Sequence, residues 1–255
     1  MKYIVCDGNW LCQKYYRGKA GFSLSSVKAD VDREIRNLGI DKAVMLFDLG
    51  RSSFRTSIYP DYKGNRASKG YSLTGELELS RNYFKGLGSP DFITIYEQNT
   101  EADDLAAFIV NRYKREGDKI YLYSIDHDWL QLLDGDKVFQ IRYSPTLHRN
   151  RILNEHDAEE ICLTPPKKWS LLAAFGGDPS DNIPSTGIKK NVALAWLKKY
   201  NWSLAKICMN EPKAKAKQNL IFKNWQLTRL TGECAKLSDD ELTALDLFFN
   251  RSCNV

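Results

Sequence analysis

The sequence has 255 residues, 43% of them hydrophobic and 27% charged, so it is long and apolar enough to fold around a sizeable buried core. No apolar run approaches the length of a membrane-spanning helix, and the N-terminus is too short and too soon acidic for a signal peptide, so we expect a cytoplasmic protein with no membrane association. The net charge of +5 says little by itself, and the six cysteines lack metal-binding spacing and are expected to be reduced thiols.

Three short apolar runs are each followed at once by an aspartate, which predicts buried strands that end in a carboxylate. These runs and their acids are residues 3–6 with Asp7, residues 43–47 with Asp48, and residues 119–125 with Asp126. Further strands are predicted at 92–96 and 138–141, and a helix at 27–38. The strand–helix–strand order predicts a mostly parallel α/β sheet, whose carboxyl edge would collect the three aspartates.

Residues 51–88 break this alternation with a polar, basic and aromatic segment. Its first part carries five cationic side chains against one acid, namely Arg51, Arg55, Lys63, Arg66 and Lys69. A segment of this kind that leaves a sheet is typical of an insertion that embraces a polyanionic substrate. The alternative is an irregular connection whose aromatic rings pack on the scaffold.

Glu101, Asp103 and Asp104 open an amphipathic run whose apolar positions, 105, 106, 109, 110 and 113, predict a half-buried helix. Thr100 is expected to be the N-cap, so the acids would lie in the first turn, where the helix dipole favours negative charge. Ordinary capping explains such acids as well as a functional site does. The acids at the strand ends favour the functional interpretation.

Beyond residue 150 the pattern becomes helical, which predicts a helix-rich region at 151–255 that shares an interface with the sheet region at 1–150. The predicted helices are 157–162, 167–175, 190–200, 204–209, 213–230 and 239–250. A turn-rich loop after the second of these carries Asp178 and Asp181, and nine lysines lie between residues 189 and 223. A basic surface beside carboxylates suits a polyanion, and solvated lysine faces are the alternative.

Nine carboxylates are expected at the carboxyl edge of the sheet or close to it. They are Asp7, Asp48, Glu101, Asp103, Asp104, Asp126, Asp128, Asp178 and Asp181. Crowded carboxylates repel one another unless cations neutralise them, and Mg²⁺ prefers oxygen ligands. Two Mg²⁺ ions about 4 Å apart, with Mn²⁺ as a substitute, would suit phosphodiester hydrolysis. Structural roles stay open for Asp178 and Asp181 as turn residues and for Asp48 as a loop cap.

The motifs, taken in order, resemble those of the 5′-nuclease superfamily: bacteriophage flap endonucleases and 5′–3′ exonucleases, and the 5′-nuclease domain of bacterial DNA polymerase I. The matching segments are Asp7-Gly8-Asn9, Phe47-Asp48, Tyr62-Lys63-Gly64-Asn65-Arg66, Glu101-Ala102-Asp103-Asp104, Asp126 with Asp128, and Gly177-Asp178-Pro179-Ser180-Asp181-Asn182-Ile183-Pro184. Single motifs are weak signals, but their shared order is specific. The resemblance implies a PIN-like sheet core, a basic helical arch within about 51–88, and a helix–turn–helix module at about 168–200.

The same resemblance implies roles for individual residues. The implied ligands are Asp7, Asp48, Glu101, Asp103 and Asp126 for a first metal ion, with Asp104 direct or through water, and Asp128, Asp178 and Asp181 for a second. The implied catalytic residues are Lys63, Arg66 and Asp126, and the implied DNA contacts are Tyr62, Lys63, Arg66, Arg55, Lys69, Gly187, Lys189 and Lys190. Lys63 and Arg66 would offset charge on the scissile phosphate, and Tyr62 would stack on the terminal base. A helix would present Lys63 and Arg66 on one face.

The turn of the expected helix–turn–helix departs from the resemblance. Gly187 stands where the first glycine of that turn belongs, but Lys189 occupies the place of the second. In such turns, backbone carbonyl groups can hold a K⁺ ion. Because Lys189 replaces the second glycine, the sequence does not decide whether this turn binds K⁺. Lys189 and Lys190 at a helix N-terminus still suit contacts to duplex phosphates.

From these residues we expect a monomeric Mg²⁺-dependent 5′ nuclease that acts on DNA with 5′ ends, flaps or nicks and reads structure rather than sequence. The RNA of RNA–DNA hybrids is a further substrate that the sequence leaves open, and a bacteriophage source would set the protein in the host cytoplasm. Two alternatives are a DNA-binding protein with weak or lost catalysis and a PIN-type endoribonuclease. The full set of acids weighs against the first, and the basic insertion weighs against the second.

Overall fold

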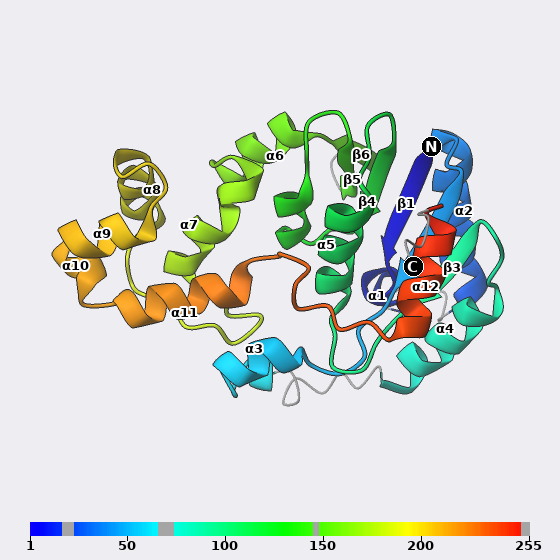
Figure 1. Cartoon of the computed structure of the whole chain (residues 1–255), viewed down its shortest axis with the longest axis horizontal. Helices are drawn as coiled ribbons and strands as arrows, with labels where there is room; N and C mark the ends of the chain where they lie inside the picture. The colour runs from blue at the N-terminus through cyan, green and yellow to red at the C-terminus, as the bar shows by residue number, and fades with distance from the viewer. Residues whose placement is uncertain (17–22, 66–73, 145–147, 251–255) are drawn as a thin grey trace.

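The computed structural model describes residues 1–16, 23–65, 74–144 and 148–250. These residues form a six-stranded sheet with the strand order β3-β2-β1-β4-β5-β6 (Figure 1). The strands are β1 (Lys2–Asp7), β2 (Lys42–Leu46), β3 (Phe92–Ile95), β4 (Lys119–Tyr123), β5 (Val138–Ser144) and β6 (Arg149–Leu153). All neighbouring strands are parallel except β5 and β6. The mostly parallel α/β sheet predicted from the sequence is confirmed.

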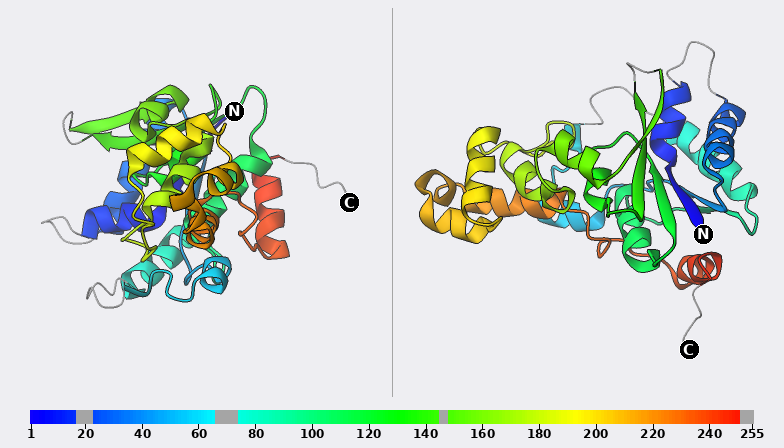
Figure 2. Two further views of the ribbon diagram at one scale, coloured as in Figure 1. Left: turned by 90° about the vertical axis from the view of Figure 1, so that its left-hand side faces the viewer. Right: turned by 90° about the horizontal axis from the view of Figure 1, so that it is seen from above.

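Helices cover both faces of the sheet (Figure 2). Alternate residues of a strand point to opposite sides, so each face of the sheet contributes side chains to a separate buried cluster. In β1, Tyr3 and Val5 enter one buried cluster, whereas Ile4 and Cys6 enter another. The first face carries α5 (Ala102–Tyr113) and α12 (Asp239–Phe248), and the second carries α1 (Gly8–Tyr16), α2 (Leu24–Leu38) and α4 (Thr74–Gly86). The central strands are therefore apolar on both sides, as covered parallel strands usually are.

The strand β6 corrects the expectation that strands end before residue 150. Its sequence is Arg-Asn-Arg-Ile-Leu, and Leu153 is its one buried residue. β6 pairs antiparallel with β5 at the edge of the sheet. Edge strands often carry charged side chains, which discourage pairing with other chains. Because β6 has such charges, its sequence lacks the alternation of apolar and polar residues that predicts a strand.

β1 leads directly into α1, with no residue between the strand and the helix. A Cβ on Gly8, the first residue of α1, would lie 2.6 Å from the Phe47 ring and 2.7 Å from the Leu46 carbonyl oxygen. Glycine therefore allows α1 to start against the neighbouring strand. The Trp10 amide donates a hydrogen bond to Asp7 at 2.9 Å, so the strand-end carboxylate also caps the helix.

The helix α5 has Glu101 as its N-cap, not Thr100 as predicted, and Glu101 makes no side-chain cap of its own. Instead, the Ala102 amide donates to Asp48 Oδ1 at 2.7 Å. Asp48 thus serves the first turn of α5, which holds the segment after β2 against the start of that helix.

The described part of residues 51–88 packs on the scaffold, as the alternative interpretation of this segment expects. α3 (Ser53–Ile58) contacts α11 (Gln218–Thr228), and α4 lies against β3. Tyr62 and Phe84 are buried. The expected arch depends on residues 66–73, which lie outside the described residues, and stays a prediction.

The helical region beyond β6 has a small core of its own. Its elements are α6 (Glu155–Cys162), the 3₁₀ helix η3 (Pro166–Lys168), α7 (Trp169–Gly176), α8 (Lys190–Lys199), α9 (Leu204–Asn210), α10 (Pro212–Lys215) and α11. The single helix predicted at 213–230 is two helices, because the backbone leaves the helical conformation at Lys217 (φ −118°, ψ 12°). α7 and α8 lie where helices were predicted at 167–175 and 190–200. That they form a helix–turn–helix module that binds DNA stays a prediction.

The chain returns to the sheet at α12 (Figure 1). Lys42 Nζ donates to the Phe248 carbonyl at 2.6 Å, and the rings of Tyr3 and Phe249 lie 4.8 Å apart. Residues 239–250 therefore pack with the sheet and not with the helices that precede them. Among the helices formed by the described residues, none has both the length and the apolar character needed to cross a membrane.

Candidate active site

Carboxylates from four segments meet at the carboxyl edge of the sheet, around the N-terminal end of α5. Asp7 ends β1, Asp48 follows β2, Asp103 lies in the first turn of α5, and Asp126 and Asp128 follow β4. Burial is the largest cause that raises the pKa of four of these acids, and repulsion by Asp103 adds to it in all four. The predicted convergence of strand-end acids is therefore present in the folded chain.

Asp7 and Asp48 are the acids whose protonation the fold alters most clearly. Burial raises the pKa of Asp7 to about 8, against the effect of hydrogen bonds from the Trp10 amide and from Ser124 Oγ at 2.9 Å. Burial also raises the pKa of Asp48 to about 6, where Lys63 opposes the shift. Two carboxyl groups that the fold makes hard to ionise at one edge form an unusually electronegative site once they do ionise.

Asp126 and Asp128 follow β4 and continue this edge. Loss of surrounding water raises the pKa of both carboxyl groups, and Asp126 repels Asp128. Trp169 Nε1 donates to Asp128 Oδ1 at 3.1 Å, and Trp129 Nε1 donates to Asp103 Oδ1 at 2.6 Å. Two indole groups therefore orient two of the acids.

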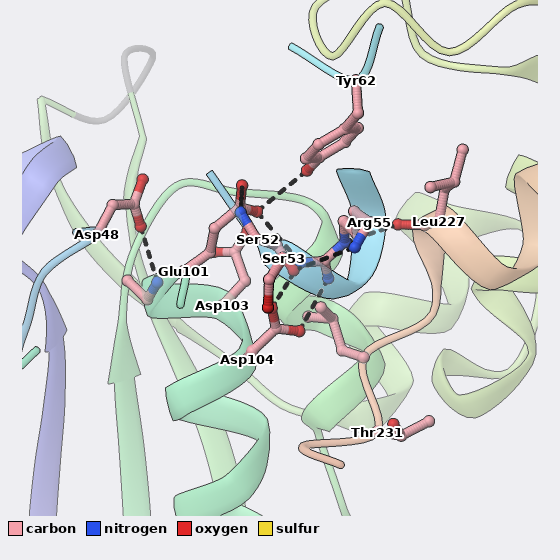
Figure 3. Close-up of polar contacts among 12 residues, drawn as sticks. Asp48, Ser52, Ser53, Arg55, Tyr62, Glu101, Asp103, Asp104, Leu227 and Thr231 are labelled. Atoms are coloured by element: carbon pink, nitrogen blue, oxygen red, sulfur yellow. Dashed lines mark hydrogen bonds and ion pairs between the residues drawn. The ribbon is translucent and has the colours of Figure 1, made fainter. Parts of the chain in front are cut away.

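Glu101 lies in a cage of four donors, and Figure 3 shows three of the residues that supply them, Ser52, Arg55 and Tyr62. The donors are the Ser52 amide at 3.3 Å, Arg55 Nη1 at 3.1 Å, the Tyr62 hydroxyl at 3.0 Å and Lys63 Nζ at 2.9 Å. Burial alone would raise the pKa of Glu101, but Lys63 and Arg55 together hold it below its ordinary value. This carboxylate is therefore ionised and already neutralised by side-chain cations.

Arg55 and Asp104 form a buried ion pair. Arg55 Nη2 lies 2.9 Å from Asp104 Oδ1 and Nη1 lies 2.5 Å from Oδ2, while Nε donates to the Leu227 carbonyl at 3.0 Å (Figure 3). Both side chains are at most 3% exposed. Each group neutralises the other in this structure, and the predicted DNA contact of Arg55 and metal contact of Asp104, direct or through water, stay predictions.

Tyr62 and Lys63 also face inward. Tyr62 is 2% exposed and Lys63 is 8% exposed, so Tyr62 has no free face on which a base could stack, and that prediction is corrected. Lys63 has φ 55° and lies in a turn, not in a helix. Arg66 and Lys69 lie outside the described residues, so their predicted roles stay predictions.

Asp181 joins the site, whereas Asp178 holds its own turn. The Tyr62 hydroxyl lies 3.0 Å from Asp181 Oδ2, and Lys63 Nζ lies 3.9 Å from the same oxygen. Asp178 Oδ1 instead accepts hydrogen bonds from the amide and the hydroxyl of Ser180, both at 2.7 Å. The turn-residue interpretation thus describes Asp178, and no contact in the described chain brings its carboxylate to the other acids.

The acids fit a hard divalent cation by chemistry, but they do not form a closed cage. Among the described residues, no three acidic, histidine or cysteine side chains lie close enough to enclose a metal ion. The Tyr62 hydroxyl has one proton for two carboxylate oxygens, of Glu101 and Asp181, each 3.0 Å away. The ammonium group of Lys63 occupies the space that a cation between those carboxylates would take. A divalent ion between those two carboxylates would need Lys63 to move.

The N-terminus of α8 lies next to this edge. Lys190 Nζ lies 5.4 Å from the ring centre of Trp169, the residue that donates to Asp128. Lys189 and Gly187 are exposed, and Gly187 has φ 76°, a conformation that glycine adopts without strain. The predicted phosphate contacts therefore lie on an accessible surface beside the acids.

Three residues that position the acids were not identified from the sequence. They are Ser124, Trp129 and Trp169, which donate to Asp7, Asp103 and Asp128 respectively. Ser124 and Trp129 flank the Asp126–Asp128 motif, so proximity was an available signal for them. Trp169 comes from a distant helix, and no local pattern marks it.

Comparison with known proteins identifies the family. The profile of the family described as "5'-3' exonuclease, N-terminal resolvase-like domain" matches residues 3–162. DNA polymerase I of Mycobacterium tuberculosis is 32% identical over 155 residues, which cover 60% of this chain and 17% of the polymerase. The chain therefore corresponds to only a small part of that relative.

Solved structures match over nearly the whole chain. A structure of the bacteriophage T5 5′-exonuclease with divalent zinc ions has a TM-score of 0.81 and 25% identity, and covers 98% of this chain and 97% of that one. The bacteriophage T5 flap endonuclease in complex with DNA and metal ions has a TM-score of 0.77 and 25% identity over the same shares. The chain belongs to the family of 5′–3′ exonuclease N-terminal, resolvase-like domains.

Proposed function

We propose that this protein is a metal-dependent 5′ nuclease that hydrolyses phosphodiesters of branched or 5′-ended DNA, as a 5′–3′ exonuclease or flap endonuclease. The observation that carries the proposal is the convergence of Asp7, Asp48, Asp103, Asp126 and Asp128 at one edge of the sheet, four of them with raised pKa values. Family membership and the resemblance to T5 enzymes solved with metal ions and with DNA support it.

Two Mg²⁺ ions, or Mn²⁺ in their place, are the proposed cofactors. Asp7, Asp48, Asp103 and Asp126 would hold the first ion, together with Glu101 once Lys63 releases it, and Asp128 and Asp181 would hold the second. Bound divalent ions supply positive charge to the phosphate that is hydrolysed. They also remove the repulsion that raises the pKa values of these acids.

Lys63 is proposed to exchange partners when substrate binds. Its ammonium group now neutralises Glu101, at 2.9 Å, and it has no exposed position from which to reach DNA. When a divalent ion takes over that neutralisation, Lys63 is free to donate to an oxygen of the scissile phosphate, with Arg66 as the proposed second donor. A cation placed there stabilises the charge that develops during hydrolysis.

Duplex DNA is proposed to bind across the N-terminus of α8. Lys189 and Lys190 offer two positive charges there, and the amide groups of a helix N-terminus suit phosphate oxygens. These contacts read the backbone, so recognition would depend on the structure of the DNA and not on its sequence. The proposal includes no assignment of a K⁺ ion to the turn at Gly187.

A gel assay with a 5′-labelled flap substrate and a blunt duplex, each with Mg²⁺ and with EDTA, tests the proposal. Metal-dependent release of the flap near its junction supports a flap endonuclease, and mononucleotides from the duplex support an exonuclease. Cleavage of single-stranded RNA alone would indicate a PIN-type endoribonuclease. Binding without cleavage, even in Mn²⁺, would contradict the proposal and indicate an inert DNA-binding protein.

A further inference from the structure

A cavity lies at the C-terminal end of α5, where the sheet region meets the helical region. It has a volume of about 470 Å³ and lies between the last turns of α5, the 3₁₀ helix η2 (Asp128–Leu132), the start of α7 and the end of α11. Asn111 and Lys114 line it, whereas Asp103 and Asp104 lie in the first turn of the same helix. At 1.5 Å per residue, roughly 10 to 16 Å of helix separates these lining residues from the acids of the first turn.

The cavity is rich in positive charge. Its lining contains four cationic side chains and one carboxylate, namely Lys114, Lys167, Lys168, Arg229 and Asp134. Asp134 pairs with Lys114 and with Lys167, at 2.8 Å for the latter, and these lysines lower its pKa to about 2. No ion pair within the described chain involves Lys168 or Arg229. Two cationic side chains are thus left for an anionic ligand.

The same cavity offers aromatic faces and unused donors. Trp202 and Trp225 are half-buried and line it, and neither indole N–H has a hydrogen-bond partner among the described residues. The guanidinium carbon of Arg229 lies 4.8 Å from the ring centre of Trp225, and its buried Nε also has no partner. A buried donor left without a partner is unfavourable, and an acceptor on a ligand would satisfy it.

The backbone at Trp202 adds a further observation. Asn201 and Trp202 both adopt the left-handed conformation, with φ 48° and 61°. Such a conformation is uncommon for a large side chain and is strained. The turn between α8 and α9 therefore holds the indole ring at the cavity against a local cost.

We propose that this cavity binds a nucleotide, with the base against a tryptophan ring and the phosphate held by Arg229 and Lys168. Planar bases stack well on aromatic side chains, and a guanidinium group with an ammonium group suits a phosphate. The volume falls in the range of small-molecule sites. The nucleotide has two sources, a free mononucleotide or a 5′-phosphorylated strand end. The cavity shares no lining residue with the acids of the carboxylate edge.

Isothermal titration of the full chain with dAMP, in EDTA so that no metal holds the ligand at the carboxylates, tests the proposal. We expect saturable binding that weakens at least about fivefold in Lys168→Ala and about tenfold or more in Arg229→Gln, since each loses a charged phosphate contact. Lys206→Ala, which removes an exposed lysine outside the cavity, is the matched control and is expected to bind as the wild type does.

Inorganic phosphate or deoxyadenosine that binds as tightly as dAMP would overturn the proposal, as would dAMP binding that neither variant changes. The exposed position of Lys168 keeps this test decisive even if Arg229→Gln does not fold. A 5′-phosphorylated oligonucleotide whose binding Lys168→Ala weakens points to the strand end as the source, and dAMP binding alone points to the free nucleotide. Both results support a nucleotide site. Flap cleavage by Lys168→Ala, measured separately, reports on the nuclease alone.

Discussion

Arg55 carries a buried charge that joins three parts of the chain. Its guanidinium group binds Asp104 and Glu101 of the α5 N-terminus and the Leu227 carbonyl of α11. Arginine suits this task because its fork of five donors stays charged when buried. The sequence shows Arg55 within a basic segment, but only the folded chain shows that its charge is neutralised by buried carboxylates.

Replacing Arg55 by alanine is expected to lower the free energy of unfolding by about 3–5 kcal/mol, because it leaves Asp104 buried without a partner. Urea denaturation followed by circular dichroism measures this loss. Lys28→Ala is the control, since it breaks a partly exposed i,i+4 pair with Asp32 that is worth about 1 kcal/mol or less. Equal losses in the two variants would mean that the buried pair does not support the fold.

Asp7 makes the stability of the metal-free protein fall as pH rises. Its pKa is about 3.9 in an unfolded chain and is raised to about 8 in the folded one. The folded state therefore holds more protons across this interval, so the contribution is fully present below about pH 4 and is lost as pH rises through about 8. In EDTA, we expect the protein to unfold at lower urea concentration at pH 8 than at pH 5.5.

The variant Asp7→Asn is expected to remove at least about 1.4 kcal/mol of this pH effect, which corresponds to one unit of pKa. The neutral amide resembles the protonated acid and does not titrate. Urea titrations at the two pH values in EDTA measure the difference for both proteins. An unchanged pH dependence in Asp7→Asn would assign the effect to other groups.

Lys63→Ala is expected to lower single-turnover flap cleavage by about 10²-fold or more, if the ammonium group stabilises charge on the phosphate as other placed donors do. Quenched-flow cleavage in Mg²⁺ at saturating enzyme measures this rate. Lys28→Ala again serves as control and should keep the wild-type rate. A Lys63→Ala enzyme of normal rate would limit Lys63 to the ion pair with Glu101.

At the scale of elements, the parallel strands were the most predictable part of the fold. Their apolar runs are covered on both faces, and the acids that follow β1, β2 and β4 mark their carboxyl ends. β6 was missed because its charged residues face solvent. The break between α10 and α11 was missed because a lysine-rich helical pattern runs through it. Local periodicity reports burial, and it is weakest where an element is exposed.

The N-terminus of α8 is the element proposed to grip duplex DNA. Replacing both Lys189 and Lys190 by alanine is expected to weaken binding and to lower the salt dependence of the binding constant by about two phosphate contacts, a slope change of roughly 1.8. Fluorescence anisotropy in EDTA over a range of KCl concentrations measures both effects. The double variant Lys206→Ala with Lys213→Ala removes the same charge at another place and is the control. If it weakens binding and lowers the salt dependence as much, the effect of the α8 lysines comes from net charge alone.

At the scale of the whole molecule, the candidate site is built by both regions. The sheet region supplies most of the acids, while Trp169 of α7 orients Asp128 and the loop after α7 brings Asp181 to Tyr62. The order of the acids in the sequence was enough to predict the carboxyl edge. It did not distinguish Asp181 from Asp178, because both are loop aspartates and only the folded loop turns one of them inward.

The most direct test of the carboxylate edge is single-turnover cleavage of a 5′-labelled flap by Asp126→Ala, measured in Mg²⁺ beside its affinity for the same DNA. We expect the variant to lose nearly all turnover and to bind the flap as the wild type does, because Asp126 lies among the acids and away from the proposed duplex contacts. Cleavage at the normal rate would contradict a metal site at this edge.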